Sequence, residues 1–291
     1  MTNQFYGHLF GDDLDAAPFD TEDYSCLKFG SDRVARAFGR ELADAFFRQH
    51  LAFLSSHQCV VIPAPSSTVP VAATLLGKHF RDRLNDLLSR VGVGPVEWNE
   101  IHRDMHYNNN YSELPKEERQ KLLTDKGRFV NRDYLVGKAL IFIDDVSITG
   151  THEDKLVHLM KVKRMNNPHM FVAYGKYTGE DASIEHRLNH RKIQTANDLA
   201  TLAHERGHRC TTRSLRLFIE ASESQMKWML KTAPRRFLED VYHSCIVKGY
   251  NVHEPYIENF ILLRAQLDRP TSALDCPPLE AARPVSIPAL A

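Results

Sequence analysis

Apolar residues recur at about every fourth position in two segments of the chain, and this spacing predicts two helices that each bury one face. The first segment has Val34, Phe38, Leu42 and Phe46, and the second has Ala73, Leu76, Phe80, Leu84 and Leu87. Serine is a residue type that caps helices, so we expect Ser31 to precede the first helix. We predict no strand in the polar segment before Ser31. We expect Thr68 to open the second helix, with Pro70 tolerated in its first turn.

Four short apolar runs are predicted to be strands, because they are rich in β-branched and aromatic residues and are bounded by turn residues. They lie within residues 58–63, 96–102, 139–145 and 169–175. A further helix is expected from about Thr151 to Val162. The runs are apolar rather than alternating, which is typical of a parallel sheet buried on both faces. The pattern therefore predicts a Rossmann-like α/β fold with about five mainly parallel strands.

The β pattern ends near residue 180, and helical patterns then continue to about Leu267. We predict an α/β domain over residues 1–180, a helical C-terminal domain over 181–267, and a Pro/Ala-rich tail over 268–291 with the composition of a disordered or extended arm. Within residues 187–248, twelve Lys and Arg accompany six Asp and Glu, so the helical domain is expected to be basic.

The amino-acid composition is that of a globular protein, and the overall charge does not indicate a binding partner. The 291 residues are 43% hydrophobic and 25% charged, and 37 Lys and Arg balance 37 Asp and Glu, as in an ordinary globular protein. The five cysteines form no CxxC pair and are far apart, which argues against a disulfide framework or a cysteine-rich zinc site. No signal peptide pattern and no apolar run of membrane-spanning length is present, so we expect a cytoplasmic protein without a membrane segment.

Candidate chemistry is concentrated in the run ALIFIDDVSITGTHED, where Asp144 and Asp145 end an apolar strand. In a parallel sheet, ligands bind beyond the carboxyl ends of the strands. The turn from Ser147 to Thr151 can direct backbone N–H groups to an anion at the start of the next helix. Backbone amides can bind a phosphate, and the neighbouring carboxylates can bind hydroxyls or Mg²⁺. This combination is suited to a sugar phosphate.

This run resembles the phosphoribosyl-pyrophosphate signature of the type I phosphoribosyltransferases. The resemblance implies that Asp144 and Asp145 bind the ribose 2′- and 3′-hydroxyls, directly or through Mg²⁺. It implies a 5′-phosphate loop that contains Ser147, Ile148, Thr149, Gly150, Thr151 and His152. It also places Ala64, Pro65, Ser66 and Ser67 at the pyrophosphate loop.

The resemblance covers roughly Tyr24 to Tyr177, and it is strongest over residues 139–152. The polar stretch from Arg103 to Asp133, here called the hood, stands where the family has a flexible catalytic hood. Its Glu118-Arg119 and Gly127-Arg128-Phe129 elements look similar to amidophosphoribosyl-like and competence-type members. Cations expected to act on the leaving group are Arg119, Lys126 and Arg128.

The sequence departs from the family pattern at three points. His152 stands where the family usually has Thr or Ser against the 5′-phosphate, and the pyrophosphate loop lacks the Arg or Lys often found there. Ile148 stands where purine-specific members have an acidic residue that handles the proton of the base, so this loop offers no general base.

The function that the resemblance implies is transfer of the phosphoribosyl group from phosphoribosyl pyrophosphate to a base or amine, with Mg²⁺ as cofactor and pyrophosphate as product. One alternative is a sensor or effector that keeps the nucleotide-sugar site and acts on nucleic acid or a protein partner through the basic region 187–248. Another is a nucleotide N-glycosidic hydrolase. A different α/β fold, in which the aspartates only end a strand and cap a helix, and assembly as a homo-oligomer both stay open.

Two other patterns compete in the helical region. His204-Glu205-Arg206-Gly207-His208 matches the HExxH zinc motif, which requires a helix. Gly207 disfavours that helix, so we prefer a helix that ends at Gly207 with its polar side chains in solvent. The same segment also resembles a helix-turn-helix, although Arg213 falls where the second helix should be apolar.

Overall fold

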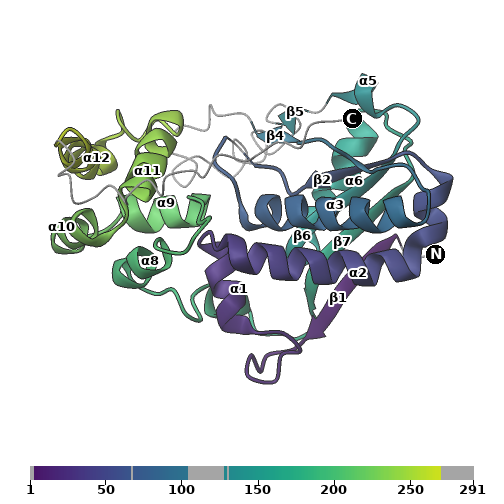
Figure 1. Cartoon of the computed structure of the whole chain (residues 1–291), viewed down its shortest axis with the longest axis horizontal. Helices are drawn as coiled ribbons and strands as arrows, with labels where there is room; N and C mark the ends of the chain where they lie inside the picture. Colours follow the sequence, from purple (N-terminus) through teal and green to yellow (C-terminus); the bar gives the residue numbers. More distant parts are fainter. Residues whose placement is uncertain (1–2, 67, 104–127, 130, 270–291) are drawn as a thin grey trace, which may run out of the picture.

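The computed structural model describes residues 3–66, 68–103, 128–129 and 131–269 (Figure 1). Its main sheet has five strands, all parallel, in the order β1-β7-β6-β2-β3. These strands are β1 (Gln4–Phe10), β2 (Cys59–Pro63), β3 (Glu97–Trp98), β6 (Ala139–Ser147) and β7 (His169–Tyr177). The predicted α/β fold with a mainly parallel sheet is therefore confirmed. A small antiparallel pair is formed by β4 (His102–Arg103) and β5 (Arg128–Phe129).

Strand β1 was missed because its sequence mixes apolar and polar residues. Among the strands that the structure describes, it pairs with β7 alone, at one edge of the sheet. Phe5 and Phe10 are buried, while Gln4 and Leu9 are exposed. An edge strand with one open face does not need the continuous apolar run by which the central strands were recognised.

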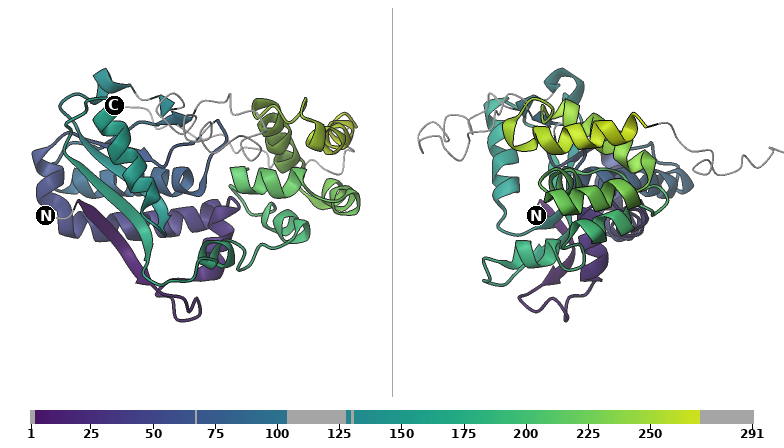
Figure 2. Two further views of the ribbon diagram at one scale, coloured as in Figure 1. Left: turned by 180° about the vertical axis from the view of Figure 1, so that it is seen from behind. Right: turned by 90° about the vertical axis from the view of Figure 1, so that its left-hand side faces the viewer.

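Helices cover both faces of the sheet (Figures 1 and 2). One face carries the mutually packed helices α2 (Asp32–Ser56) and α3 (Ala72–Arg90), and the other carries α6 (Thr151–Val162). Strand β6 is buried on both sides: Ile141 and Ile143 belong to the first core, and Leu140 and Phe142 to the second. Its alternate side chains therefore point into two different layers.

The predicted helix starts were correct for α2 and α6 and wrong for α3. Ser31 caps α2 by accepting a hydrogen bond from the Val34 amide at 3.2 Å. Helix α3 starts at Ala72 rather than Thr68, and Val71 before it is extended. Pro70 explains the shift, because it disfavours the helical conformation of the residue that precedes it.

The described residues after Tyr177 contain helices and no strand (Figure 1). The helices are α7 (Ile184–Asn189), α8 (Ala196–Leu202), α9 (Thr212–Ile219), α10 (Glu223–Thr232), α11 (Arg235–Val247) and α12 (Glu254–Leu267). Their buried side chains, such as Phe218 and Phe237, belong to the same core cluster as those of α2 and α3. The boundary near residue 180 stays a prediction.

Two short helices complete the described part, α1 (Thr21–Lys28) and α5 (Arg132–Leu135). Among the described residues, no helix has the length and apolar character needed to cross a membrane. Arg119, Lys126, Ser67 and nearly all of the predicted tail lie outside the described residues.

Candidate functional site

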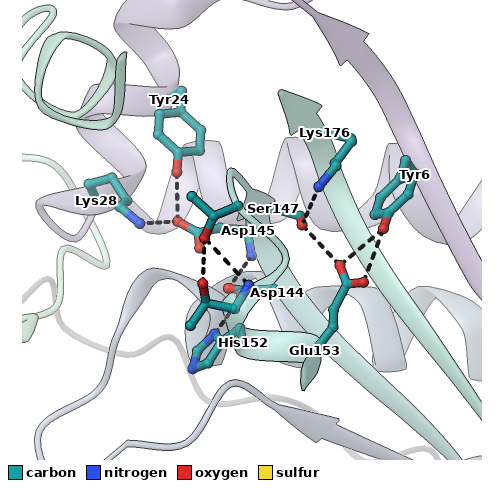
Figure 3. Close-up of polar contacts among 11 residues, drawn as sticks. Tyr6, Tyr24, Lys28, Asp144, Asp145, Ser147, His152, Glu153 and Lys176 are labelled. Atoms are coloured by element: carbon teal, nitrogen blue, oxygen red, sulfur yellow. Dashed lines mark hydrogen bonds and ion pairs between the residues drawn. The ribbon is translucent and has the colours of Figure 1, made fainter. Parts of the chain in front are cut away.

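The two aspartates lie inside strand β6 rather than at its end. In the register with β7, Asp144 is opposite Ala173 and Ser147 is opposite Lys176, so the strand continues through Ser147. Ser147 was predicted as a loop residue and is instead the last strand residue. Because side chains alternate along a strand, Asp144 and Asp145 point to opposite faces of the sheet (Figure 3).

Asp145 points toward helix α1 and is 5% exposed. Its Oδ2 accepts a hydrogen bond from the Tyr24 hydroxyl at 2.9 Å and forms an ion pair with Lys28. These two partners are one helical turn apart on α1, so both reach the same carboxylate. Burial alone would raise the pKa of Asp145, but the Lys28 charge and the hydrogen bonds lower it well below its usual range.

Asp144 points toward helix α6, and its side chain is 24% exposed. Its Oδ2 lies 2.7 Å from Nδ1 of His152, and its Oδ1 accepts a hydrogen bond from the Asp145 amide at 2.9 Å. Burial raises the pKa of Asp144 to about 6, although the His152 hydrogen bond opposes the shift. His152, which the resemblance placed at the 5′-phosphate, thus pairs with a carboxylate here.

The loop between β6 and α6 has the form of an anion-binding turn. Gly150 precedes α6 with φ of 73° and ψ of −3°, a left-handed conformation that favours glycine. The hydroxyls of Thr149 and Thr151 lie 2.7 Å apart and are both exposed. The first-turn N–H groups and the dipole of this 12-residue helix favour an anion at its N-terminus.

Side chains of three strands and α6 meet beside this loop, and no sequence pattern signals these contacts (Figure 3). Glu153 accepts hydrogen bonds from Tyr6 at 3.0 Å and from Ser147 at 2.9 Å. Lys176 donates to the Ser147 hydroxyl at 3.2 Å. The pKa of Tyr6 is raised by burial and by the Glu153 charge. Lys176 thus brings a positive charge to the start of the loop between β6 and α6.

The predicted pyrophosphate loop follows β2 and lies next to the strand that carries the aspartates. The Ala64 amide donates to the Ile143 carbonyl at 2.8 Å, and Ala64, Pro65 and Ser66 are buried. Residues 64–66 and the 148–152 loop therefore lie at the carboxyl ends of the neighbouring strands β2 and β6. Arg128 is in β5, and its side chain is not described.

The HExxH motif does not have the geometry of a zinc site, because α8 ends at Leu202 and His204 to His208 follow it in turns. The His204 ring hydrogen-bonds the Thr232 carbonyl, and Glu205 accepts from Arg33. The preferred interpretation was also wrong: the helix ends earlier, and His208 is buried against the Phe29 carbonyl. Residues 203–211 separate α8 from α9, which is longer than the turn of a helix-turn-helix.

The basic excess of residues 187–248 is largely paired in the structure. Ion pairs with carboxylates are made by Arg187, Arg191, Lys192, Arg213, Arg216, Lys227 and Arg235. Such pairs reduce the open positive charge that nucleic acid binding requires. This arrangement does not favour the nucleic-acid alternative.

A cavity of about 650 Å³ lies between α3 and α11. It is lined by Val69, Leu75, Arg209 and Asp240, among others, and by neither Asp144 nor Asp145. The cavity is therefore distinct from the site that contains the two aspartates.

Mg²⁺ is the cofactor that the resemblance implies. No group of three metal-ligating side chains occurs among the residues that the structure describes. Asp144 is the more exposed of the two carboxylates, whereas Asp145 is neutralised by Lys28. Protein Mg²⁺ sites often use one or two carboxylates together with substrate phosphates. The donor set fits a Mg²⁺ held by Asp144 and the phosphates of a ligand.

Solved structures of other proteins show a distant similarity to this chain. They include a hypoxanthine phosphoribosyltransferase from Staphylococcus aureus, with 10% identity over 50% of this chain and 76% of that chain and a TM-score of 0.32. They also include the L. donovani hypoxanthine-guanine phosphoribosyl transferase, with 12% identity over 50% of this chain and 73% of that chain and a TM-score of 0.32. A search of curated proteins found no match.

A family model described as PRTase ComF-like matches residues 1–263. The match confirms the resemblance read from Asp144 to Thr151 and extends through most of the helical region. The chain therefore belongs to the ComF-like family of phosphoribosyltransferases.

Proposed function

We propose that the protein binds phosphoribosyl pyrophosphate or a nucleotide at the carboxyl edge of the sheet, and that it transfers the phosphoribosyl group to a base or amine with release of pyrophosphate. One observation carries the proposal: the partly exposed Asp144 carboxylate stands beside the Gly150 turn at the N-terminus of α6. A carboxylate for hydroxyls next to a cradle for phosphate matches the two ends of a ribose 5-phosphate.

Each part of the ligand then has a candidate partner. The 5′-phosphate is bound by the turn from Ile148 to Thr151 and the first N–H groups of α6. The ribose hydroxyls are bound by Asp144, while Asp145, on the opposite face of the sheet, pairs with Lys28. The pyrophosphate lies over residues 64–67, and Arg119, Lys126 and Arg128 of the hood remain candidates to contact it.

The reaction needs negative charge near the sugar and positive charge on the leaving group. Departure of pyrophosphate develops positive charge on the ribose ring, which the Asp144 carboxylate stabilises. When bound, Mg²⁺ would neutralise charge on the departing pyrophosphate. Ile148 offers no base to the acceptor, so an acceptor amine that is already nucleophilic suits the site better than a purine that must lose a proton.

A second candidate uses the same site for sensing rather than transfer. The lack of a general base at Ile148 and the pairing of Asp145 with Lys28 suit a protein that binds the ligand without chemistry. Such a protein would pass the signal to a partner through the helical region. Pyrophosphate release separates the two, because a sensor binds the ligand and releases none.

Calorimetric titration with phosphoribosyl pyrophosphate and Mg²⁺ tests the proposal. We expect wild type to bind and Asp144→Asn to bind about tenfold or more weakly, since a charge-assisted hydrogen bond is lost. Asp154→Asn is the matched control, because it also removes one carboxylate charge, from the first turn of α6 at an exposed position. Equal affinity in wild type and Asp144→Asn, or no binding by wild type, would refute the proposed site.

Turnover is measured next with a panel of bases and amines. Pyrophosphate released only with an acceptor present supports a transferase. Free base released from a nucleotide in the absence of pyrophosphate supports the hydrolase instead.

A further inference from the structure

The predicted pyrophosphate loop, Ala64 to Ser67, contains no positively charged residue. A loop of this composition offers an anion only neutral donors, which are backbone N–H groups and serine hydroxyls. The structure brings another cation to the aspartates: Lys28, whose side chain is 15% exposed and whose ammonium pairs with Asp145 (Figure 3). This lysine is at the C-terminal end of α1 and far from Asp145 in the sequence.

The end of α1 is held by residues that precede α9. The Thr211 hydroxyl donates to the Lys28 carbonyl at 2.9 Å, and the Arg209 amide donates to the Gly30 carbonyl at 3.0 Å. Nε2 of His208 lies 2.9 Å from the Phe29 carbonyl. Burial lowers the pKa of His208 to about 4, so the ring is neutral at pH 7 and its Nε2–H donates to this carbonyl.

The contact at Gly30 requires glycine. Its φ is 106°, and a Cβ built there would lie 1.9 Å from the Arg209 carbonyl oxygen. The backbones of the α1–α2 turn and of residues 208–212 therefore pack directly on each other.

The same segment also holds the chain that leaves the pyrophosphate loop. The Thr212 amide donates to the Pro70 carbonyl at 2.9 Å. Thr211 and Thr212 are consecutive, and they begin α9 as its N-cap and first residue. The start of α9 thus ties together the backbone of Lys28 and the segment that follows residues 64–67.

We propose that Lys28 binds the diphosphate of the ligand, and that Thr211 positions Lys28 for this contact. The inference rests on the proposed function and deepens it, because it assigns the helical region a role within the sugar-diphosphate site. Lysine is a common phosphate ligand, and a diphosphate carries more negative charge than the single carboxylate that Lys28 now meets. Asp145 keeps the ammonium in place before the ligand arrives.

The test compares two ligands, phosphoribosyl pyrophosphate and ribose 5-phosphate, by calorimetry at one Mg²⁺ concentration. Lys28→Met should weaken phosphoribosyl pyrophosphate binding by about tenfold and ribose 5-phosphate binding much less. Thr211→Val should change the ratio of the two affinities in the same direction, and Thr211→Ser, which keeps the hydroxyl, should restore it. The control is Lys192→Met. Lys192 is an exposed lysine that pairs with Glu22 of α1, the helix that also carries Lys28.

Lys28→Met leaves Asp145 without its ion-pair partner, so a second comparison removes that effect. Inorganic pyrophosphate is titrated into Asp145→Asn and into Lys28→Met/Asp145→Asn. Weaker binding by the double variant supports the contact, and equal binding overturns it.

The two proposals fail in different ways. If wild type binds neither sugar phosphate, the proposed function is wrong, and this inference falls with it. If wild type binds and Asp144→Asn does not, but Lys28→Met and Thr211→Val leave the affinity ratio unchanged, only the role of Lys28 and Thr211 is refuted.

Discussion

Nδ1 of His152, in the first turn of helix α6, lies 2.7 Å from Oδ2 of Asp144 in strand β6. The neighbouring carboxylate, Asp145, is held on the opposite face by Lys28 and Tyr24. Two consecutive acidic residues therefore have different environments: one is partly exposed with a raised pKa, and the other is buried with a lowered pKa. The asymmetry leads to distinct effects for the two Asp→Asn substitutions.

Asp145→Asn should destabilise the fold much more than Asp144→Asn. Removing Asp145 leaves the mostly buried Lys28 ammonium without its partner, and breaking a buried pair costs about 3–5 kcal/mol of unfolding free energy. Asp144→Asn removes a carboxylate that is disfavoured by burial, so we expect at most a small loss at pH 7. Urea unfolding of both variants measures the difference, and equal losses would contradict the asymmetry.

The two aspartates should also give opposite pH dependences of stability. Asp144 has a folded pKa of about 6, above its unfolded value, so its contribution falls as the pH rises between about 4 and 6. Asp145 has a lowered folded pKa, so its contribution is present above about pH 4 and is lost as the pH falls further.

Unfolding of wild type and Asp144→Asn at pH 4.5 and pH 7.5 checks the first effect. The stability of Asp144→Asn relative to wild type should increase at the higher pH. If the difference in unfolding free energy between the two proteins is the same at both pH values, the pKa of Asp144 is not raised in the folded state.

Local signals in the sequence predicted strand β6 and the start of α6, although β6 continues through Ser147, whereas contacts between distant residues could not be predicted. The apolar run before Asp144 and the turn at Gly150 are contiguous, so the strand and α6 followed from spacing alone. Lys28 and Tyr24 reach Asp145 across more than a hundred residues, and no periodicity reports such a contact. The same holds for Lys176, which meets Ser147 only because β7 pairs with β6.

Gly150→Ala and Gly30→Ala separate backbone strain from steric clash. Gly150 has φ of 73°, and a Cβ there would meet no described residue within 4 Å beyond its chain neighbours, so alanine should cost only the left-handed penalty of about 1–2 kcal/mol. At Gly30 the Cβ would also collide with the Arg209 carbonyl oxygen, so the loss of unfolding free energy should be clearly larger. Thermal and urea unfolding measure both, and similar losses would refute the close approach at Gly30.

Glu153→Gln should change stability and phosphate affinity in opposite directions. Glu153 stabilises the first turn of α6 through the helix dipole, by about 0.3–1 kcal/mol, and it accepts hydrogen bonds from Tyr6 and Ser147. The same negative charge lies beside the loop where the 5′-phosphate is proposed to bind, and it opposes a phosphate there. Glutamine keeps the size and an acceptor oxygen but removes the charge.

We therefore expect Glu153→Gln to unfold at lower urea concentration and to bind ribose 5-phosphate a few-fold more tightly, since two charges about 4 Å apart in water interact by about 1 kcal/mol. The gain in affinity should shrink at high salt, where the repulsion is screened. Lys176→Met is the complementary change, because it removes the cation on the other side of Ser147 and should weaken the same binding. If Glu153→Gln instead weakens phosphate binding, the carboxylate holds the loop in its binding conformation, and its structural role outweighs its charge.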